Sequence, residues 1–281
     1  MLVNMNDILP KAREGHYAVG FFNAVNVEMA RAVIETAEEL HSPVMLGTAE
    51  VLLPAMSLDR VSEYVIPMAQ KAKVPVCVHF DHGLSYAKCM EALRLGFNSV
   101  MYDCSTAKYE ENVAAVADMV SICHRLDVTV EAELGHVGDN EGEGKLSDPS
   151  DFYTDPDVAL DFVRRTGADA LAVAVGNAHG AYKFPPKLDF DRIAVISEKT
   201  GLPLVLHGGS GLSDSDFRTA VQLGISKINI FTDIDRAGRL GIERGLREGA
   251  TSMMGLIPYE IEAMKDVVRN KLELFGSVGK A

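Results

Sequence analysis

The run Ala170-Leu171-Ala172-Val173-Ala174-Val175 decides the fold class, because its apolar residues follow one another without any polar alternation. A strand with this pattern must be buried on both faces, as strands of parallel sheets are. Working outward from it, we predict eight such strands: Tyr17 to Phe22, Pro43 to Gly47, Pro75 to Phe80, Ser99 to Asp103, Thr129 to Leu134, Ala170 to Val175, Pro203 to Leu206 and Lys227 to Ile230.

The segments between these runs have helical periodicity. Val27 to Leu40 carries its apolar residues on one face, and Ser213 can cap a helix that runs through Phe217 to Leu223. Eight strands alternating with helices predict an α/β fold, a (β/α)8 TIM barrel with a single domain over residues 1–281. A doubly wound open sheet is the alternative, but no GxGxxG turn follows the first strand.

Composition excludes some partners. The net charge of -13 argues against nucleic acid, although a few backbone N–H groups can still bind one small phosphorylated molecule. Neither a secretory leader nor an apolar stretch of about 18 residues is evident, so we expect a cytoplasmic protein without a membrane partner. The four cysteines form no CxxC pair and are expected to be reduced.

Polar side chains are concentrated where the predicted strands end. The carboxyl ends of barrel strands meet at one mouth, where (β/α)8 enzymes have their active sites. The residues at these positions are Asn23, Thr48, Asp81, His82, Asp103, Glu133, Asn177, His179, His207, Asn229 and Thr232.

Three histidines at strand ends, His82, His179 and His207, predict a divalent metal site with a position left open for water or substrate. Asp81 is either a proton donor and acceptor beside the ion or a partner that orients a histidine. Asp81 and His82 can share the mouth only if the strand has ended and the backbone turns between them. His79 is expected to be structural.

Asp103 and Glu133 leave two alternatives open, since they could orient the ligands or hold a metal at another position. The glycine-rich segments His179-Gly180 and His207-Gly208-Gly209-Ser210-Gly211, together with Asn229 to Thr232, predict a phosphate site after strands six to eight. The long irregular stretch Gly135 to Asp155 predicts a mobile loop over the mouth.

These motifs resemble the class II, metal-dependent fructose- and tagatose-bisphosphate aldolase family. The resemblance covers essentially the whole chain and rests on His79-Phe80-Asp81-His82-Gly83, Met101-Tyr102-Asp103-Cys104-Ser105, Val130-Glu131-Ala132-Glu133-Leu134-Gly135, Ala172 to Gly180 and Pro203 to Gly211. Tyr102 and Cys104 depart from the Ile and Gly common in the family, which leaves the choice of aldehyde open.

The resemblance implies one catalytic Zn2+ on the three histidines, sometimes with a monovalent cation such as Na+ nearby. It implies that Asp81 is the acid/base group, that Asn229 steadies the enediolate, and that Gly180, Gly208, Ser210 and Thr232 bind the dihydroxyacetone phosphate end. Gly209, Asn23 and Thr48 are further candidates for substrate binding, and Glu141 and Glu143 are candidates for the base that removes the dihydroxyacetone phosphate proton. Similar enzymes also suggest a homodimer or homotetramer.

We therefore expect reversible retro-aldol cleavage of a phosphorylated ketose. A class I mechanism would need a lysine at a strand end, whereas Lys227 is expected at the start of strand eight, on the opposite face. Two alternatives remain: a metal-dependent barrel hydrolase, and a catalytically silent protein that binds sugar phosphates.

Overall fold

The strands form a closed ring in the order of the sequence. The structure is a computed structural model that describes residues 1–137, 153–180 and 187–281. All neighbouring strands are parallel, and the eighth pairs with the first: β1 Val19–Asn23, β2 Val44–Ala49, β3 Val76–Gly83, β4 Ser99–Tyr102, β5 Thr129–Leu134, β6 Ala170–Val173, β7 Leu204–Leu206 and β8 Ile225–Ile230. The predicted TIM barrel is confirmed.

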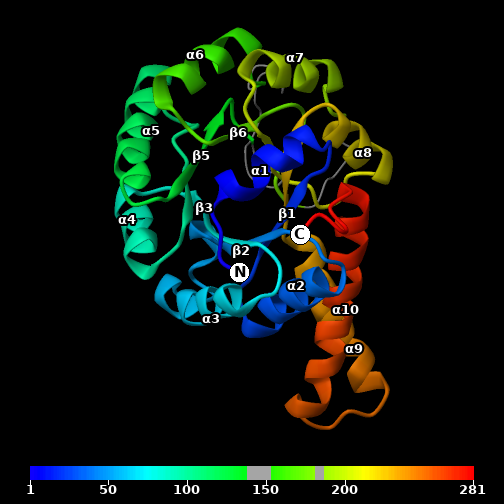
Figure 1. Cartoon of the computed structure of the whole chain (residues 1–281). Coiled ribbons are helices and arrows are strands. Elements are labelled where there is room, and N and C mark those ends of the chain that lie inside the picture. Colours follow the sequence, from blue (N-terminus) through cyan, green and yellow to red (C-terminus); the bar gives the residue numbers. More distant parts are fainter. Residues whose placement is uncertain (138–152, 181–186) are drawn as a thin grey trace, which may run out of the picture.

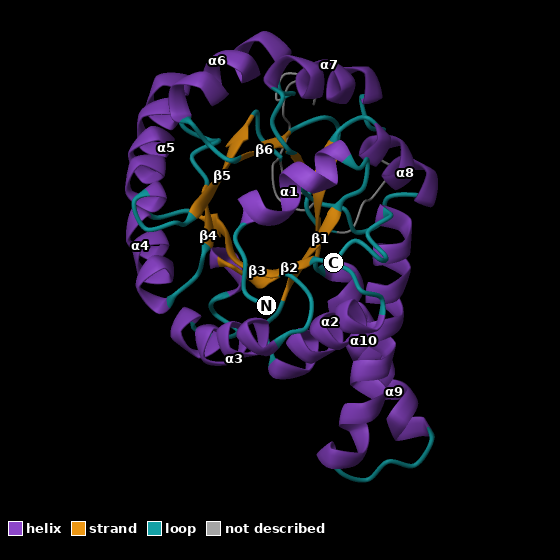
Figure 2. Ribbon diagram, viewed as in Figure 1, coloured by secondary structure: helices purple, strands orange, loops and turns teal. Residues whose placement is uncertain are grey.

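Helices surround the ring on its outside (Figure 1, Figure 2). Where helices were predicted, α2 has Leu40 as its C-terminal cap, and Ser213 caps α8 by accepting from the backbone N–H of Asp216. The helices are α1 Met5–Glu14, α2 Val27–Glu39, α3 Leu58–Lys71, α4 Tyr86–Leu95, α5 Tyr109–His124, α6 Pro156–Thr166, α7 Phe190–Thr200, α8 Asp214–Gln222, α9 Thr232–Arg247 and α10 Met253–Phe275, with a short 3-10 helix η1 at Glu50–Leu52.

Alternation along each strand sorts side chains between two environments. In β3, Val78 and Phe80 belong to the core between strands and helices, whereas Cys77 belongs to a second core inside the ring. Because the period of a strand is two, His79 and Asp81 follow Cys77 into the ring. The interior is therefore apolar at the amino ends of the strands and polar toward their carboxyl ends.

Helix α1 closes the amino end of the barrel. It begins with a capping box, in which Asn4 accepts from the helix backbone and the Asp7 side chain accepts from the Asn4 N–H. Its buried face, which includes Ile8 and Leu9, packs with the interior residue Val19. Figure 2 shows α1 lying across one end of the strand ring. Only the opposite end is then left for a site.

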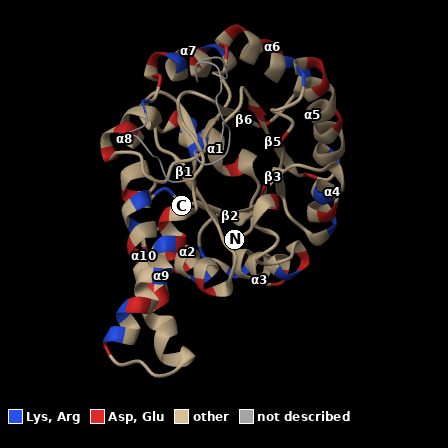
Figure 3. Ribbon diagram, turned by 180° about the vertical axis from the view of Figure 1, so that it is seen from behind, with Lys and Arg blue, Asp and Glu red and all other residues tan. Residues whose placement is uncertain are grey.

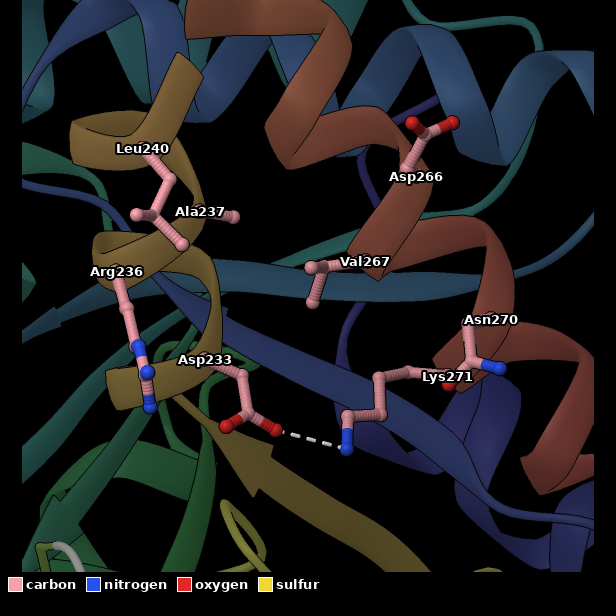
Figure 4. Close-up of a pocket in the computed structure, with 8 residues that line it drawn as sticks. All are labelled: Asp233, Arg236, Ala237, Leu240, Asp266, Val267, Asn270 and Lys271. Carbon is pink, nitrogen blue, oxygen red and sulfur yellow. Dashed lines mark ion pairs between the residues drawn. The ribbon is translucent and has the colours of Figure 1, made fainter. Parts of the chain in front are cut away.

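Helices α9 and α10 pack on each other and project beyond the ring (Figure 1). A groove of about 390 Å³ runs between them, where Lys271 Nζ lies 2.8 Å from Asp233 Oδ2 (Figure 4). Acidic and basic side chains are interspersed along the outer helices (Figure 3). Within the described residues, no helix combines the length and apolarity needed to cross a bilayer.

Two strand boundaries differ from those expected in ways that bear on the site. Strand β8 begins at Ile225 rather than Lys227, because Ile225 already pairs with Leu204 of β7. Strand β3 continues to Gly83 instead of ending at Phe80. The first places Lys227 inside β8 rather than at its start, and the second changes how the polar side chains at the end of β3 are directed.

Candidate functional site

The end of β3 directs two consecutive polar residues into the mouth. The expectation that the strand must have ended before His82 is wrong, since β3 still pairs with β4 at Gly83. A register shift between Phe80 and Gly83 interrupts the regular alternation, and His82 has a left-handed backbone with φ of 41°. Such a bulge redirects a side chain without ending the strand. Asp81 and His82 therefore both reach the mouth.

The three predicted ligands come together. His82 Nε2 lies 2.7 Å from His207 Nδ1, and the His179 ring centroid is 4.8 Å from that of His82 and 5.6 Å from that of His207. One ring nitrogen from each histidine lies within 4.8 Å of the others, so the three can converge on one cation. His82 belongs to β3, whereas His179 and His207 follow the ends of β6 and β7.

Two of these rings are oriented by carboxylates. Asp103 Oδ2 is 2.8 Å from His82 Nδ1, and Glu131 Oε1 is 2.8 Å from His207 Nε2. A carboxylate opposite one ring nitrogen fixes the proton there and leaves the other nitrogen available to a metal, an arrangement common around metal-binding histidines. Of the two roles expected for Asp103, its position here favours orientation of His82.

Gly208 brings the turns after β6 and β7 into contact. It has a left-handed backbone with φ of 63°, and a Cβ added there would lie 2.0 Å from the carbonyl oxygen of Ala178. Only glycine allows such an approach. His179 and His207, which are neighbours of this contact in the chain, are thereby held close to each other.

Asp81 lies beside the histidines and has its own partners. The Asn229 side-chain amide donates to its two oxygens at 3.1 and 3.2 Å, and the Asn23 amide donates at 3.4 Å. Burial by itself would raise the pKa of Asp81, but the positive charges of His82 and Lys227 and the contact with His79 hold it well below its usual value. Asp81 is therefore ionised, the state that a proton acceptor must have.

An ionic layer lies inside the barrel beneath the histidines. Lys227 Nζ is 2.8 Å from Glu131 Oε2 and 4.0 Å from Asp81 Oδ1, and His79 Nε2 lies within 3.7 Å of both carboxylates. The expectation that Lys227 is the first residue of strand eight, at the face opposite the strand ends, is wrong, since β8 begins at Ile225 and Lys227 reaches the carboxylates of Glu131 and Asp81. Lys227 is in register with Val19 of β1, which belongs to the interior core, so Lys227 shares the interior face with Asn229.

The candidate ligands and the neighbouring carboxyl groups have shifted pKa values. Burial alone would lower the pKa of His82, but the carboxylates of Asp81 and Asp103 raise it to about 10. Burial, followed by the charge of His82, lowers the pKa of His179 to about 3. Burial and the Asp103 carboxylate raise the pKa of Glu133 to about 8. The facing nitrogens of His82 and His207 are at hydrogen-bond distance and so share one proton. A divalent cation can displace that proton when it binds the two rings.

The predicted phosphate segment meets the start of α9. The Ser210 Oγ accepts from the backbone N–H of Asp233, and Thr232 is the first residue of a helix with no side-chain cap. Free N–H groups at a helix start favour an anion. Gly180 has φ of 76°, and a Cβ added there would meet no atom of the described residues within 4 Å. The Gly209 backbone N–H donates to the Asn229 carbonyl oxygen.

One candidate is not brought into this cluster, and two lie outside the described residues. Thr48 is buried in β2 in register with Phe80, whose ring belongs to the outer core, so alternation directs Thr48 away from Asp81. Its part in substrate binding stays a prediction. Glu141 and Glu143 lie outside the described residues, as does most of the expected loop from 135 to 155.

Glu131 and Lys227 were missed as site residues, and His79 was assigned only a structural role. A signal was available, because each lies two positions before a predicted site residue: His79 before Asp81, Glu131 before Glu133, and Lys227 before Asn229. Polar residues at this spacing within apolar strands face the same side.

Comparisons with known proteins agree over the full length. A family model described as "Fructose-bisphosphate aldolase class-II" matches residues 3–280. A fructose-bisphosphate aldolase of Thermus caldophilus is 40% identical, with 100% of both chains covered. The Escherichia coli K12 protein named "Uncharacterized protein YdjI" is 42% identical over 96% of both chains. The crystal structure of the YdjI aldolase superposes with a TM-score of 0.91, at 39% identity and full coverage of both chains.

Proposed function

Because this chain belongs to the class II fructose-bisphosphate aldolase family, whose members are lyases, we propose that it cleaves a phosphorylated ketose reversibly. The products are dihydroxyacetone phosphate and an aldehyde, and the reaction depends on Zn2+. The observation that carries the proposal is the convergence of His82, His179 and His207 beside the ionised Asp81.

The donor set fits zinc. Three imidazoles leave a coordination position for substrate, and carboxylates already orient two of the rings. A buried trio of His79, Asp81 and Glu131 also has ligand-like spacing, but the Lys227 ammonium lies among its atoms. The bound ion supplies Lewis-acid stabilisation of the negative charge left on the ketone fragment. A monovalent cation near the phosphate is part of the same proposal.

Asp81 takes the proton from the hydroxyl group next to the bond that breaks, and returns it in the synthetic direction. Its carboxylate is held by two side-chain amides, so it can face the substrate without repositioning. The Oδ1 atoms of Asn23 and Asn229 are buried and have no hydrogen-bond partner in the described structure. Buried polar atoms of this kind are normally satisfied, and a polyhydroxylated ligand offers the donors. Asn229 is placed to steady the enediolate.

The phosphate of the ketone fragment is bound by Gly180, Gly208, Gly209, Ser210 and Thr232. The start of α9 beside Ser210 supports this assignment, since its N–H groups favour an anion. A phosphorylated substrate is thus compatible with the acidic net charge of the whole chain.

We also propose Glu141 or Glu143 as the base that removes the carbon-bound proton of dihydroxyacetone phosphate. The Glu141→Gln and Glu143→Gln variants should slow deuterium exchange into dihydroxyacetone phosphate while keeping their zinc content. Unchanged exchange in both would assign the base to another residue. The cytoplasmic location and a homodimeric or homotetrameric state are further proposals that rest on the family.

Chelation tests the central claim. Removal of metal should abolish formation of two carbonyl fragments from fructose or tagatose bisphosphate, and Zn2+ should restore it, because the ion is the electron sink. The His179→Ala variant should lose zinc together with activity.

The outcomes also separate the alternatives. Full activity without metal, or trapping of substrate by borohydride, would refute the zinc mechanism. Products of water addition would indicate a hydrolase, and tight zinc and ligand binding without turnover would indicate a silent binding protein. A panel of aldehydes assayed with dihydroxyacetone phosphate identifies the acceptor.

A further inference from the structure

Lys227 is a charged residue with no exposure to solvent, deep inside the barrel. Its side chain and those of Glu131 and His79 are all 0% exposed. A buried charge is costly unless it is paired, and such pairs are retained where they fix a particular arrangement. The partners of Lys227 therefore indicate what it does.

The closest partner is a carboxylate with a second task. Glu131 uses Oε2 to contact Lys227 Nζ at 2.8 Å, while its Oε1 lies 2.8 Å from His207 Nε2. The opposite nitrogen of that ring, Nδ1, faces His82. An unbroken chain of contacts thus connects the ammonium to the metal face of His207.

The surroundings leave Lys227 little freedom to move. Its Nζ lies 4.6 Å from the centroid of the Phe21 ring, a cation–π distance, and the same ring packs edge-on against His79. Asp81 Oδ1, at 4.0 Å, lies on the side of the mouth. The ammonium is thereby directed at the space between the two carboxylates.

We propose that Lys227 is a positioning residue for the metal site. It holds Glu131 in the orientation that accepts the Nε2–H of His207, and so keeps Nδ1 of that ring available to the metal. Among the described residues, the other ion-pair partners of Glu131 are histidines. A fully buried carboxylate that has lost its only permanently charged partner among these residues does not keep its geometry. The inference rests on the proposed zinc site but not on the aldol reaction.

Zinc affinity tests the proposal, because loss of orientation and loss of charge at Lys227 change zinc affinity in opposite directions. A cation near the site repels zinc, so removal of its charge alone would tighten binding. Loss of orientation instead weakens binding, by about 10- to 100-fold for a group that holds a ligand. We expect Lys227→Met to weaken zinc binding in a competition titration against a chelator.

Lys265→Met is the matched control. Lys265 is a largely buried lysine paired with Glu39 on the outer helices, far from the mouth. Its loss should lower stability but leave zinc affinity unchanged. Unchanged or tighter zinc binding in Lys227→Met would overturn the proposal, as would an equal loss in the control.

A second pair of variants tests whether Lys227 acts through Glu131. It also keeps the proposal testable if Lys227→Met folds poorly. Glu131→Gln should weaken zinc binding, and Lys227→Met/Glu131→Gln should match it within about twofold, since non-additivity marks residues that act through each other. A further tenfold loss in the double variant would show that Lys227 does not act through Glu131. If the unmodified protein bound no zinc, the proposed function itself would fail, which is a separate result.

Discussion

At the scale of single residues, Asp81 is distinguished from the other carboxylates of the mouth by its partners. Asp103 and Glu131 each contact a ring nitrogen of a proposed zinc ligand at 2.8 Å. Asp81 instead receives hydrogen bonds from the amides of Asn229 and Asn23. This division favours proton transfer, rather than ligand orientation, as the role of Asp81.

Asp81→Asn should therefore lower kcat by about 100- to 10,000-fold, because the amide keeps the size of the side chain but cannot exchange the proton. Zinc stoichiometry and substrate affinity should change little. The measurement is kcat together with zinc content on one preparation, at low and at saturating zinc. Recovery of kcat by added zinc would instead make Asp81 an orienting residue.

At the scale of elements, the turns after the strands determine how the proposed zinc ligands meet. Strands β6 and β7 end at Val173 and Leu206, so His179 and His207 both lie beyond the last residue of their strand. The contact between Gly208 and Ala178 connects the two turns. Loss of that contact should separate two ligands without altering either.

Gly208→Ala should weaken zinc binding and lower stability. The left-handed backbone alone costs about 1–2 kcal/mol for a residue with a Cβ. The clash with the Ala178 carbonyl adds to this cost and forces the turns apart. Zinc affinity and the free energy of unfolding in urea measure the two effects.

Gly201→Ala is the control for this variant, because Gly201 has φ of 65° but no atom within 4 Å of an added Cβ. Gly201→Ala should lower the free energy of unfolding by the backbone cost alone and leave zinc affinity unchanged. Equal zinc affinity in the two variants would contradict the role given to the contact at Gly208.

At the scale of the whole molecule, the barrel has two ends with different tasks. Helix α1 fills the amino end with apolar side chains, and the polar residues occupy the carboxyl end. In (β/α)8 enzymes the first end serves stability and the second carries the chemistry. Substitutions at the amino end should thus affect stability without affecting the site.

Leu9→Ala tests this separation. Leu9 is 1% exposed, and its truncation leaves a cavity that should cost about 2–5 kcal/mol. Urea unfolding measures the loss, and kcat and zinc affinity are measured at a temperature where the variant remains folded. A fall in kcat under those conditions would show that the two ends are coupled.

Local patterns in the sequence were sufficient for the barrel and for the three histidines. Apolar runs such as Ala170 to Val175 predict a strand from their own composition, and the position of a histidine one to four residues after such a run predicts which end of the barrel it occupies. Both inferences need only neighbouring residues. The burial of a strand on two faces and its direction in the barrel are the same in every strand–helix unit.

The ionic layer beneath the histidines was decided by the tertiary structure. The spacing of Lys227 and Asn229 predicts that they share a face of β8, but the pairing of β8 with β1 decides that this face lies inside the ring, where Lys227 is in register with Val19. The contact of Lys227 with Glu131 further requires closure of the ring, which brings β5 and β8 to one interior. Likewise, the bulge that turns His82 into the mouth arises in the pairing of β3 with β4. Register and closure join residues far apart in the chain, so only the folded molecule determines these contacts.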